Sequence, residues 1–229
     1  MNQETKSFYD SLADDYHLIF AGWKKSAKRQ GQILAGILKG IGCKPPAEIL
    51  DCSCGIGTQA IGLALQGYNV LRTDLSPKSI LRAKKETRRF GVKIEYRTAS
   101  FQELPAVMGK QVDAAIACDN SLPHLLTDKS LFVALRNIQA VIGPGGVFLA
   151  SIRDYDAILE SKPNVTQRMK LESGRKQSFS FQEWIWKKKA HVYTLNHFIL
   201  KKSGFRNIAW LMPNQSGFYQ PIVVGFKNK

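Results

Sequence analysis

The chain has 229 residues, an apolar fraction of 44% and a formal net charge of +15 at pH 7. This length fits one α/β domain with a modest insertion, and the apolar fraction is enough for a packed core. No apolar run approaches the length of a membrane-spanning helix, and the first residues lack the layout of a signal peptide, so we expect a cytoplasmic protein with no membrane partner.

The basic residues fall in short runs along the sequence, which raises the hypothesis of a nucleic-acid partner. The first two runs, at 24–29 and 82–89, lie on helical patterns, where a charged outer face is normal. No aromatic-rich RNA-recognition motif accompanies them. A solvated surface is therefore favoured, and a nucleic-acid partner is not excluded.

The cysteines do not have the spacing of a metal site. Cys43, Cys52, Cys54 and Cys118 contain no repeated CxxC pair and have few histidines to join them. We expect free, buried thiols, no disulfide and no bound metal.

Periodicity predicts an N-terminal helical region followed by strands that alternate with helices. Phe8, Leu12, Tyr16 and Phe20 recur at helical spacing, which indicates one amphipathic helix. The following elements are expected, in chain order, at 26–41 (helix), 48–52 (strand), 58–66 (helix), 69–73 (strand), 76–90 (helix), 92–99 (strand), 111–119 (strand), 128–141 (helix) and 146–154 (strand). This order predicts an α/β fold with a doubly wound, mostly parallel, Rossmann-like sheet.

The pattern changes after residue 154. Residues 175–200 are expected to form an antiparallel hairpin about 187–190, and two further strands are expected at 205–212 and 218–226. The predicted fold therefore ends in an antiparallel closing hairpin.

A glycine turn follows the first predicted strand, in the stretch "DCSCGIGT". Gly55 and Gly57 let the backbone approach a ligand closely, and Asp74 at the end of the next strand can accept both hydroxyls of a ribose. A dinucleotide turn should also have a glycine where Ser53 stands. Three interpretations of the turn remain: it binds a dinucleotide, it binds another adenosine cofactor, or it is purely structural. Asp74 favours the binding of an adenosine group.

Three motifs extend this pattern: "LDCSCGIGTQAIGLALQGYNV" at the turn, "DNSLPHL" after the fourth strand and "RDYD" after the fifth. With them the chain resembles class I S-adenosylmethionine-dependent methyltransferases, and within that class the glycine/sarcosine N-methyltransferase-like small-molecule enzymes. The resemblance implies one methyltransferase domain over 1–229, with a helical lid (1–45), a cofactor-binding core (46–154), a substrate-side insertion with a hairpin (155–203) and closing strands (204–229).

The resemblance also implies a cofactor site and an acceptor site. The residues that it implies for binding S-adenosylmethionine are Tyr16, Trp23, Asp51, Gly55, Gly57, Asp74, Leu75, Ser100, Phe101, Asp119, Asn120 and His124. Asp74 should bind the ribose, Phe101 should border the adenine, and Tyr16 and Trp23 should close over the cofactor. Relatives often have an acid where Ser100 stands and a small residue where Arg72 stands.

Asn120 and Arg153 are the expected catalytic residues, since both would orient the acceptor. The resemblance matches Arg153 to the position that holds a substrate carboxylate, which suits a bidentate guanidinium. Two simpler interpretations remain: Arg153 pairs with Asp154 or Asp156, and His124 caps the following helix.

The expected reaction is methyl transfer to the amine of a small molecule, an amino acid such as glycine or sarcosine, by a monomer or a homo-oligomer. One alternative is an RNA methyltransferase, although "DNSLPH" lacks the "[DN]PP[FYW]" run used on base amino groups. The other is a cofactor-binding protein that has lost catalysis, because the segment before Gly204 is shorter than in relatives.

Overall fold

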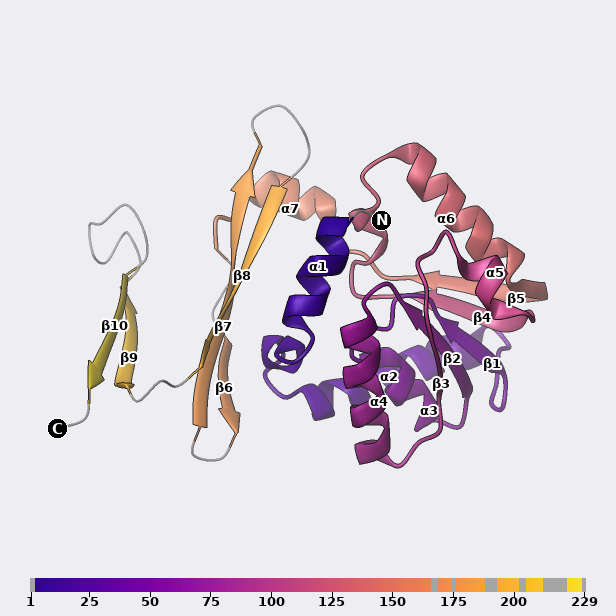
Figure 1. Cartoon of the computed structure of the whole chain (residues 1–229), viewed down its shortest axis with the longest axis horizontal. Coiled ribbons are helices and arrows are strands. Elements are labelled where there is room, and N and C mark those ends of the chain that lie inside the picture. Colours follow the sequence, from indigo (N-terminus) through magenta and orange to yellow (C-terminus); the bar gives the residue numbers. More distant parts are fainter. Residues whose placement is uncertain are drawn as a thin grey trace.

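The computed structural model describes residues 3–165, 169–173, 176–187, 193–201, 205–211 and 222–227 (Figure 1). Its central element is a five-stranded sheet with the order β3-β2-β1-β4-β5. The strands are β1 (Glu48–Asp51), β2 (Asn69–Asp74), β3 (Glu95–Thr98), β4 (Val112–Ala117) and β5 (Ile142–Ala150). Every pair is parallel, as predicted.

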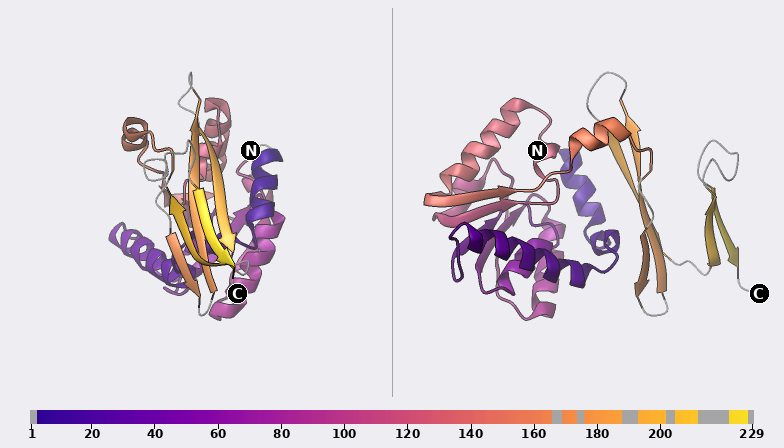
Figure 2. Two further views of the ribbon diagram at one scale, coloured as in Figure 1. Left: turned by 90° about the vertical axis from the view of Figure 1, so that its left-hand side faces the viewer. Right: turned by 180° about the vertical axis from the view of Figure 1, so that it is seen from behind.

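The sheet is covered by helices on both faces because its strands are apolar on both. Ile49 packs against α2 (Trp23–Gly40) and α3 (Thr58–Ala64), while the next residue, Leu50, packs on the side of α5 (Leu104–Met108) and α6 (Asp128–Ala140). Seen from behind, α2 lies in the foreground (Figure 2). The chain order reverses between β1 and β4, so their carboxyl ends border the crevice where such folds bind ligands.

The sequence predicts the ends of a helix correctly where a capping residue is present. Helix α4 (Pro77–Phe90) starts after Ser76, whose Oγ accepts a hydrogen bond from the backbone N–H of Ser79 at 3.0 Å. It ends at Gly91 in the left-handed region, with φ of 67°. Both limits were predicted from the sequence.

The N-terminal helix is shorter than predicted. Helix α1 spans Gln3–Leu12, and Tyr16 lies in a separate 3₁₀ turn, η1 (Tyr16–Ile19). Asp14 and Asp15 are poor helix formers, and the N–H of Asp15 donates to the Leu12 carbonyl at 2.9 Å to close a turn. The apolar stripe therefore continues across a break rather than along one helix.

Strand β5 also starts earlier than predicted. It begins at Ile142 and includes the "GPGG" stretch, where the register with β4 shifts and Gly145 has a φ of 74°. The glycines make this bulge possible, so the stretch is part of the strand and does not merely precede it.

The strands that follow β5 are antiparallel. Strands β6 (Met169–Ser173), β7 (Lys176–Trp186) and β8 (Tyr193–Lys201) form one sheet, and β9 (Phe205–Leu211) pairs with β10 (Ile222–Lys227). The two predicted hairpins are thus confirmed, whereas β6 and helix α7 (Tyr155–Ser161) were not anticipated. The β9–β10 hairpin forms a sheet of its own and lies beyond β6–β8 from the parallel sheet, so β5 is the sheet's edge (Figure 1).

Two further predictions concern the whole chain. All four cysteines are free; Cys52, Cys54 and Cys118 are buried, and Cys43 is half-buried. None of the helices in the described ranges has the length and apolar character needed to cross a membrane.

Candidate active site

A pocket opens at the carboxyl ends of β1, β2 and β4, under the N-terminal segment. It is lined by Tyr9, Tyr16, Cys52, Ser53, Gly55, Asp74, Leu75, Ala99, Ser100, Phe101, Cys118, Asp119, Ser121 and His124. Most of the predicted cofactor residues are among these, and they come together from loops far apart in sequence. Trp23, Asp51, Gly57 and Asn120 lie outside this lining.

Asp74 is held by the glycine turn. Its Oδ2 accepts the backbone N–H of Gly55 and its Oδ1 that of Ser76, each at 2.8 Å. Burial raises the pKa of the Asp74 carboxyl, and these two N–H donors oppose that rise. The carboxylate therefore fixes the turn as well as facing the pocket.

Ser53, which stands where a dinucleotide turn has glycine, links two loops. Its Oγ donates to Oγ of Ser121 at 2.8 Å, so the loop after β1 is joined to the loop after β4. Gly55 has a φ of 52°, the left-handed backbone that a glycine adopts without strain.

Three predicted residues support the pocket from behind. Trp23 is buried and donates from Nε1 to Oγ1 of Thr58 at 2.9 Å, at the start of α3. Gly57 precedes that helix with a φ of 95°. Asp51 is 1% exposed, and burial raises the pKa of its carboxyl to about 7.

The N-terminal segment reaches across the pocket through two tyrosines. The hydroxyl of Tyr16 donates to Oδ2 of Asp119 at 3.3 Å, and the hydroxyl of Tyr9 lies 2.8 Å from Nε2 of His124. Burial raises the pKa of both phenols, so each remains a neutral hydroxyl. The free space under the lid is only about 50 Å³.

The loop after β4 has an unusual backbone. Asp119 and Asn120 have φ values of 60° and 66°, which cost non-glycine residues roughly 1–3 kcal/mol each. Two hydrogen bonds from their N–H groups to Ser151 hold this conformation, at 2.9 and 3.1 Å. Strained backbone of this kind is typical of functional loops.

Asn120 turns away from the pocket lining toward the segment after β5. Its Oδ1 accepts from the backbone N–H of Arg153 at 3.1 Å and from the hydroxyl of Tyr155 at 3.0 Å. The two predicted catalytic residues are therefore in direct contact.

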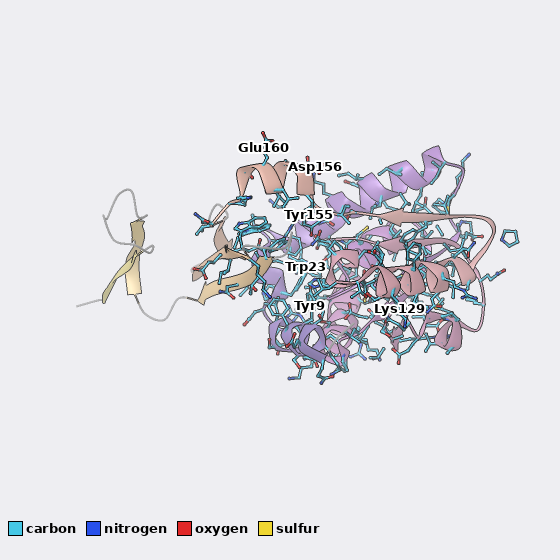
Figure 3. The ribbon with its side chains drawn as sticks, turned by 90° about the horizontal axis from the view of Figure 1, so that it is seen from above. Tyr9, Trp23, Lys129, Tyr155, Asp156 and Glu160 are labelled. Carbon is cyan, nitrogen blue, oxygen red and sulfur yellow. The ribbon has the colours of Figure 1, made fainter. Side chains whose placement is uncertain are left out.

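Arg153 is surrounded by aromatic and amide groups. Its guanidinium carbon lies 4.9 Å from the centre of the Trp184 ring, and Nη1 donates to the Tyr193 hydroxyl at 3.2 Å. The predicted alternative, an ion pair with Asp154 or Asp156, is not found. Oδ1 of Asp154 instead accepts from the N–H of Ala157 at the start of α7, and Asp156 points away from the core (Figure 3).

The simpler interpretation, in which His124 caps the following helix, is wrong. Thr127 caps α6, with its Oγ1 accepting from the N–H of Ser130 at 3.2 Å, so His124 is not needed as a cap. Burial and then the charge of Arg153 lower the pKa of His124, which favours a neutral imidazole beside Tyr9.

The loop after β3 contains an acid despite the serine at position 100. Glu103 accepts hydrogen bonds at Oε2 from the N–H and Oγ of Ser100, at 2.7 and 2.6 Å. Phe101 is fully buried at the pocket wall. Glu103 itself lies outside the lining.

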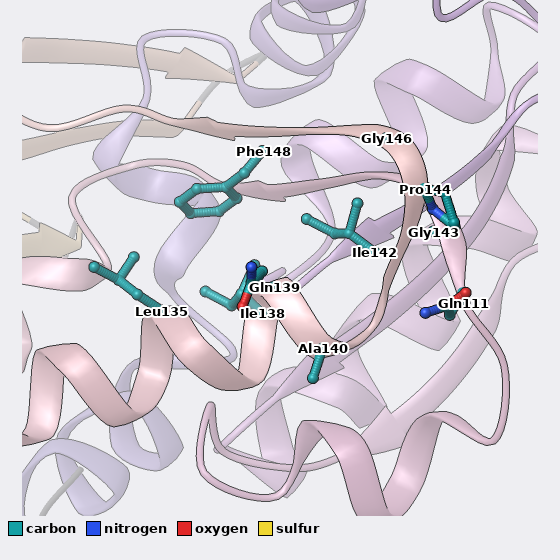
Figure 4. Close-up of a pocket in the computed structure, with 10 residues that line it drawn as sticks. All are labelled: Gln111, Leu135, Ile138, Gln139, Ala140, Ile142, Gly143, Pro144, Gly146 and Phe148. Carbon is teal, nitrogen blue, oxygen red and sulfur yellow. The ribbon is translucent and has the colours of Figure 1, made fainter.

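A larger hollow of about 640 Å³ lies elsewhere, between α6 and β5 (Figure 4). It is lined by Gln111, Leu135, Ile138, Gln139, Ala140, Ile142, Gly143, Pro144, Gly146 and Phe148. This lining contains no charged residue. The first pocket, in contrast, brings together Asp74, Asp119 and His124, and is therefore the candidate active site.

Comparison with known proteins fits this geometry. Residues 49–146 match the family model described as a methyltransferase domain. The crystal structure of an S-adenosylmethionine-dependent methyltransferase from Clostridium acetobutylicum has the same fold, with a TM-score of 0.55 and 14% identity, covering 87% of this chain and 81% of that one. The chain contains a class I S-adenosylmethionine-dependent methyltransferase domain.

Two curated relatives are more similar in sequence to this chain. A glycine/sarcosine N-methyltransferase of Parasynechococcus marenigrum is 28% identical over 145 residues, which cover 63% of this chain and 50% of the relative. A ubiquinone biosynthesis O-methyltransferase of Dechloromonas aromatica is 35% identical over 106 residues, covering 46% and 44%. The chain thus spans about half the length of these relatives.

The residues at this pocket and next to it fit the cofactor S-adenosylmethionine. Asp74 and Phe101 in the lining suit the ribose and the adenine. Asp51 lies behind the lining, and its Oδ2 is buried without a hydrogen-bond partner in the described residues, which suits an ammonium donor. A typical ligand pocket has about 300–1,000 Å³, so we expect the N-terminal segment to shift when the cofactor binds.

The sequence analysis missed some residues of the site. Tyr9 lies seven positions before Tyr16, which would be two turns of the single helix that the sequence predicted, and that spacing could have indicated it. Tyr155 belongs to the "RDYD" motif. Tyr193 lies in the predicted hairpin at 175–200, and no local signal connects it with Arg153.

Proposed function

We propose that this protein transfers a methyl group from S-adenosylmethionine to the amine of a small molecule that also has a carboxylate, such as glycine or sarcosine. The observation that carries the proposal is the environment of Arg153. In the described part of the chain, no carboxylate lies within ion-pair distance of its guanidinium.

The neighbours of Arg153 support this acceptor. Its partners Tyr193 and Trp184 are neutral, so the positive charge is not compensated by them. The charge is close enough to the pocket to lower the pKa of His124. A half-buried guanidinium without an ion-pair partner favours a carboxylate ligand, which it can bind through two parallel hydrogen bonds.

When bound, S-adenosylmethionine supplies an electrophilic methyl group on a sulfonium whose leaving group is a neutral thioether. The protein therefore needs no acid for the leaving group. Its main tasks are to align the acceptor and to exclude water, which account for much of the rate in such displacements.

Arg153 and Asn120 share the alignment. Arg153 would hold the acceptor's carboxylate, and its contact with Asn120 ties that anchor to the strained loop beside the pocket. The positive charge of Arg153 also disfavours a protonated amine nearby, so it helps to keep the nucleophile neutral. Tyr9 and Tyr16 close the site against water from the lid.

The test is a cofactor-consumption assay over glycine, sarcosine, dimethylglycine and related amino acids, each paired with its descarboxy amine. Under this proposal the carboxylated member of a pair is consumed and its descarboxy partner is a poor substrate. Equal rates for the two members would contradict the carboxylate anchor.

A second candidate is O-methylation of a phenol, which the Tyr9–His124 pair favours. A neutral imidazole at the pocket can accept a phenol's proton, either directly or through Tyr9. A catechol in the same assay tests this candidate, and methyl transfer to it but not to the amines would replace the first proposal.

Two other outcomes distinguish the remaining alternatives. Transfer of labelled methyl groups to a defined position of a tRNA would indicate an RNA methyltransferase. Cofactor binding without turnover on any acceptor would indicate lost catalysis. Weak RNA binding that disappears at moderate salt would reflect only the net charge of +15.

A further inference from the structure

Arg72 is a buried cation beneath the cofactor turn that the proposed reaction does not use. It lies on β2, two residues before Asp74, and is 1% exposed. Burial lowers the pKa of its guanidinium to about 10, so the group is still charged at neutral pH. A charge buried this deeply is costly unless it is compensated, so its surroundings need an explanation.

The guanidinium is only partly satisfied by polar contacts. Its carbon lies 3.7 Å from the centre of the Tyr96 ring, and Nη2 donates to Oγ1 of Thr87. Nε and Nη1 have no hydrogen-bond partner within the described ranges. The cation is thus held by a ring on one side and is open toward the turn on the other.

The side of the guanidinium without hydrogen bonds faces Gly57. A Cβ atom built on Gly57 would lie 2.1 Å from Nη1 and 3.3 Å from the guanidinium carbon of Arg72. Arg72 therefore occupies the space that a side chain at position 57 would need. The left-handed φ of 95° at Gly57 and the contact with Arg72 both restrict that position to glycine.

Arg72 also acts on a group of carboxylates at the carboxyl edge of the sheet. Burial is the main cause that raises the pKa of Asp51, and Asp74 and Asp119 add to the rise. The N–H of Ser53 and the charge of Arg72 oppose it. The positive charge of Arg72 therefore offsets part of the repulsion that Asp74 and Asp119 exert on the Asp51 carboxylate.

We propose that Arg72 is a positioning residue for the cofactor: it supports the turn through Gly57, and its buried positive charge favours an Asp51 carboxylate whose Oδ2 accepts the cofactor's ammonium group. The proposal rests on the cofactor of the proposed function and not on the acceptor. It is therefore tested by binding alone, without any turnover.

The experiment measures the dissociation constant of S-adenosylmethionine by calorimetry between pH 6 and pH 9, for wild type, Arg72→Met, Arg72→Lys and Lys84→Met. Lys84 is the matched control, since its Nζ lies 5.7 Å from the same Tyr96 ring but the residue is exposed. The ratio of variant to wild-type constants is compared at each pH, because the titration of the ligand then cancels.

For Arg72→Met we expect a ratio of about ten or more at pH 7 that falls as the pH rises. The reason is that without Arg72 the Asp51 carboxyl ionises only at higher pH, and the ionised fraction of a carboxyl below its pKa falls about tenfold when that pKa rises by one. Arg72→Lys should retain part of the affinity, and Lys84→Met should have a ratio near one. A folded Arg72→Met protein with a ratio near one, or with a ratio independent of pH, would overturn the proposal.

A second pair of variants covers the case in which Arg72→Met does not fold. Gly57→Ala should weaken cofactor binding strongly in wild type, and less in an Arg72→Lys background, where the nitrogen nearest to the new methyl group is gone. Equal losses in the two backgrounds would contradict the steric part of the proposal.

Discussion

The backbone N–H of Arg153 donates to Oδ1 of Asn120 at 3.1 Å, which joins the segment after β5 to the loop after β4. Asn120 is held in a left-handed conformation, so this contact transmits a fixed backbone geometry to the proposed carboxylate anchor. A substitution that displaces either residue should therefore also change the position of the other.

Replacing Arg153 with Ala should lower kcat/KM at least a hundredfold, or about 3 kcal/mol, because a charge-assisted bidentate contact is lost. Arg153→Lys should recover only part of this, since an ammonium does not reproduce the planar fork. Steady-state kinetics on the amino acid identified in the acceptor assay provide the measurement. Cofactor affinity should hardly change.

Arg88→Ala, at an exposed position of α4, is the control for the loss of a positive charge. Full activity in a well-folded Arg153→Ala protein would remove the main reason for choosing amino-acid acceptors. A loss that follows unfolding, seen by thermal denaturation, would assign Arg153 to stability instead.

Asp74→Ala should weaken cofactor binding by about 1.5–3 kcal/mol or more, because hydrogen bonds to a charged group are lost. The two N–H donors of Gly55 and Ser76 also lose their acceptor, so the turn itself should loosen. Asp74→Asn keeps one oxygen acceptor and should lie between Ala and wild type. Calorimetry with S-adenosylhomocysteine, which needs no acceptor, would show unchanged affinity if Asp74 were not in the site.

At pH 6.5, where a free imidazole is half charged, His124 should be charged to a smaller extent, since its pKa is lowered by burial and by Arg153. The unfolded chain then binds more protons than the native one as the pH falls through 6.5. His124 should therefore reduce stability below that pH and have no effect above it. Its ring resonances in an NMR titration, assigned with His124→Gln, measure this directly, and a midpoint at or above 6.5 would contradict it.

Gly31 and Gly36 offer a matched pair of substitutions within α2. A Cβ on Gly31 would lie 2.2 Å from the backbone of Gly62 in α3, whereas a Cβ on Gly36 would meet nothing within 4 Å. Gly31→Ala should destabilise the fold by roughly 1–3 kcal/mol through overpacking. Gly36→Ala should stabilise it by roughly 0.5–1 kcal/mol, because alanine is the better helix former. Urea unfolding of both variants gives the comparison, and equal effects would mean that the two helices are less tightly packed.

The parallel sheet could be predicted because its signals are local. Apolar runs mark β1, β2 and β4, and Ser76 and Gly91 mark the ends of α4. The break after Leu12 and the glycine bulge in β5 could not be predicted in the same way, since the turn and the strand register decide them. Helix α7 is short and lacks a strong apolar period.

The cofactor side of the site was easier to predict than the acceptor side. Gly55, Asp74 and Asp119 follow strand ends, so the topology alone brings them together. Arg153 and Asn120 were found through the family resemblance, whereas their partners Tyr155 and Tyr193 were not. Those contacts depend on how the β7–β8 hairpin lies against the core, which no short stretch of sequence specifies.

The close packing of Gly31 on Gly62 bears on how quickly the cofactor can be exchanged. Because backbone meets backbone there, α2 cannot tilt without separating from α3, and the segment able to open ends at Trp23. Release of the spent cofactor then has to break the hydroxyl contacts of Tyr9 and Tyr16, together with the hydrogen bonds that tie Asp10 to Ser76 and the Asp14 carbonyl to Arg82. The barrier to release is set by a short stretch of chain, and substitutions in that stretch should change the turnover rate without changing the chemical step.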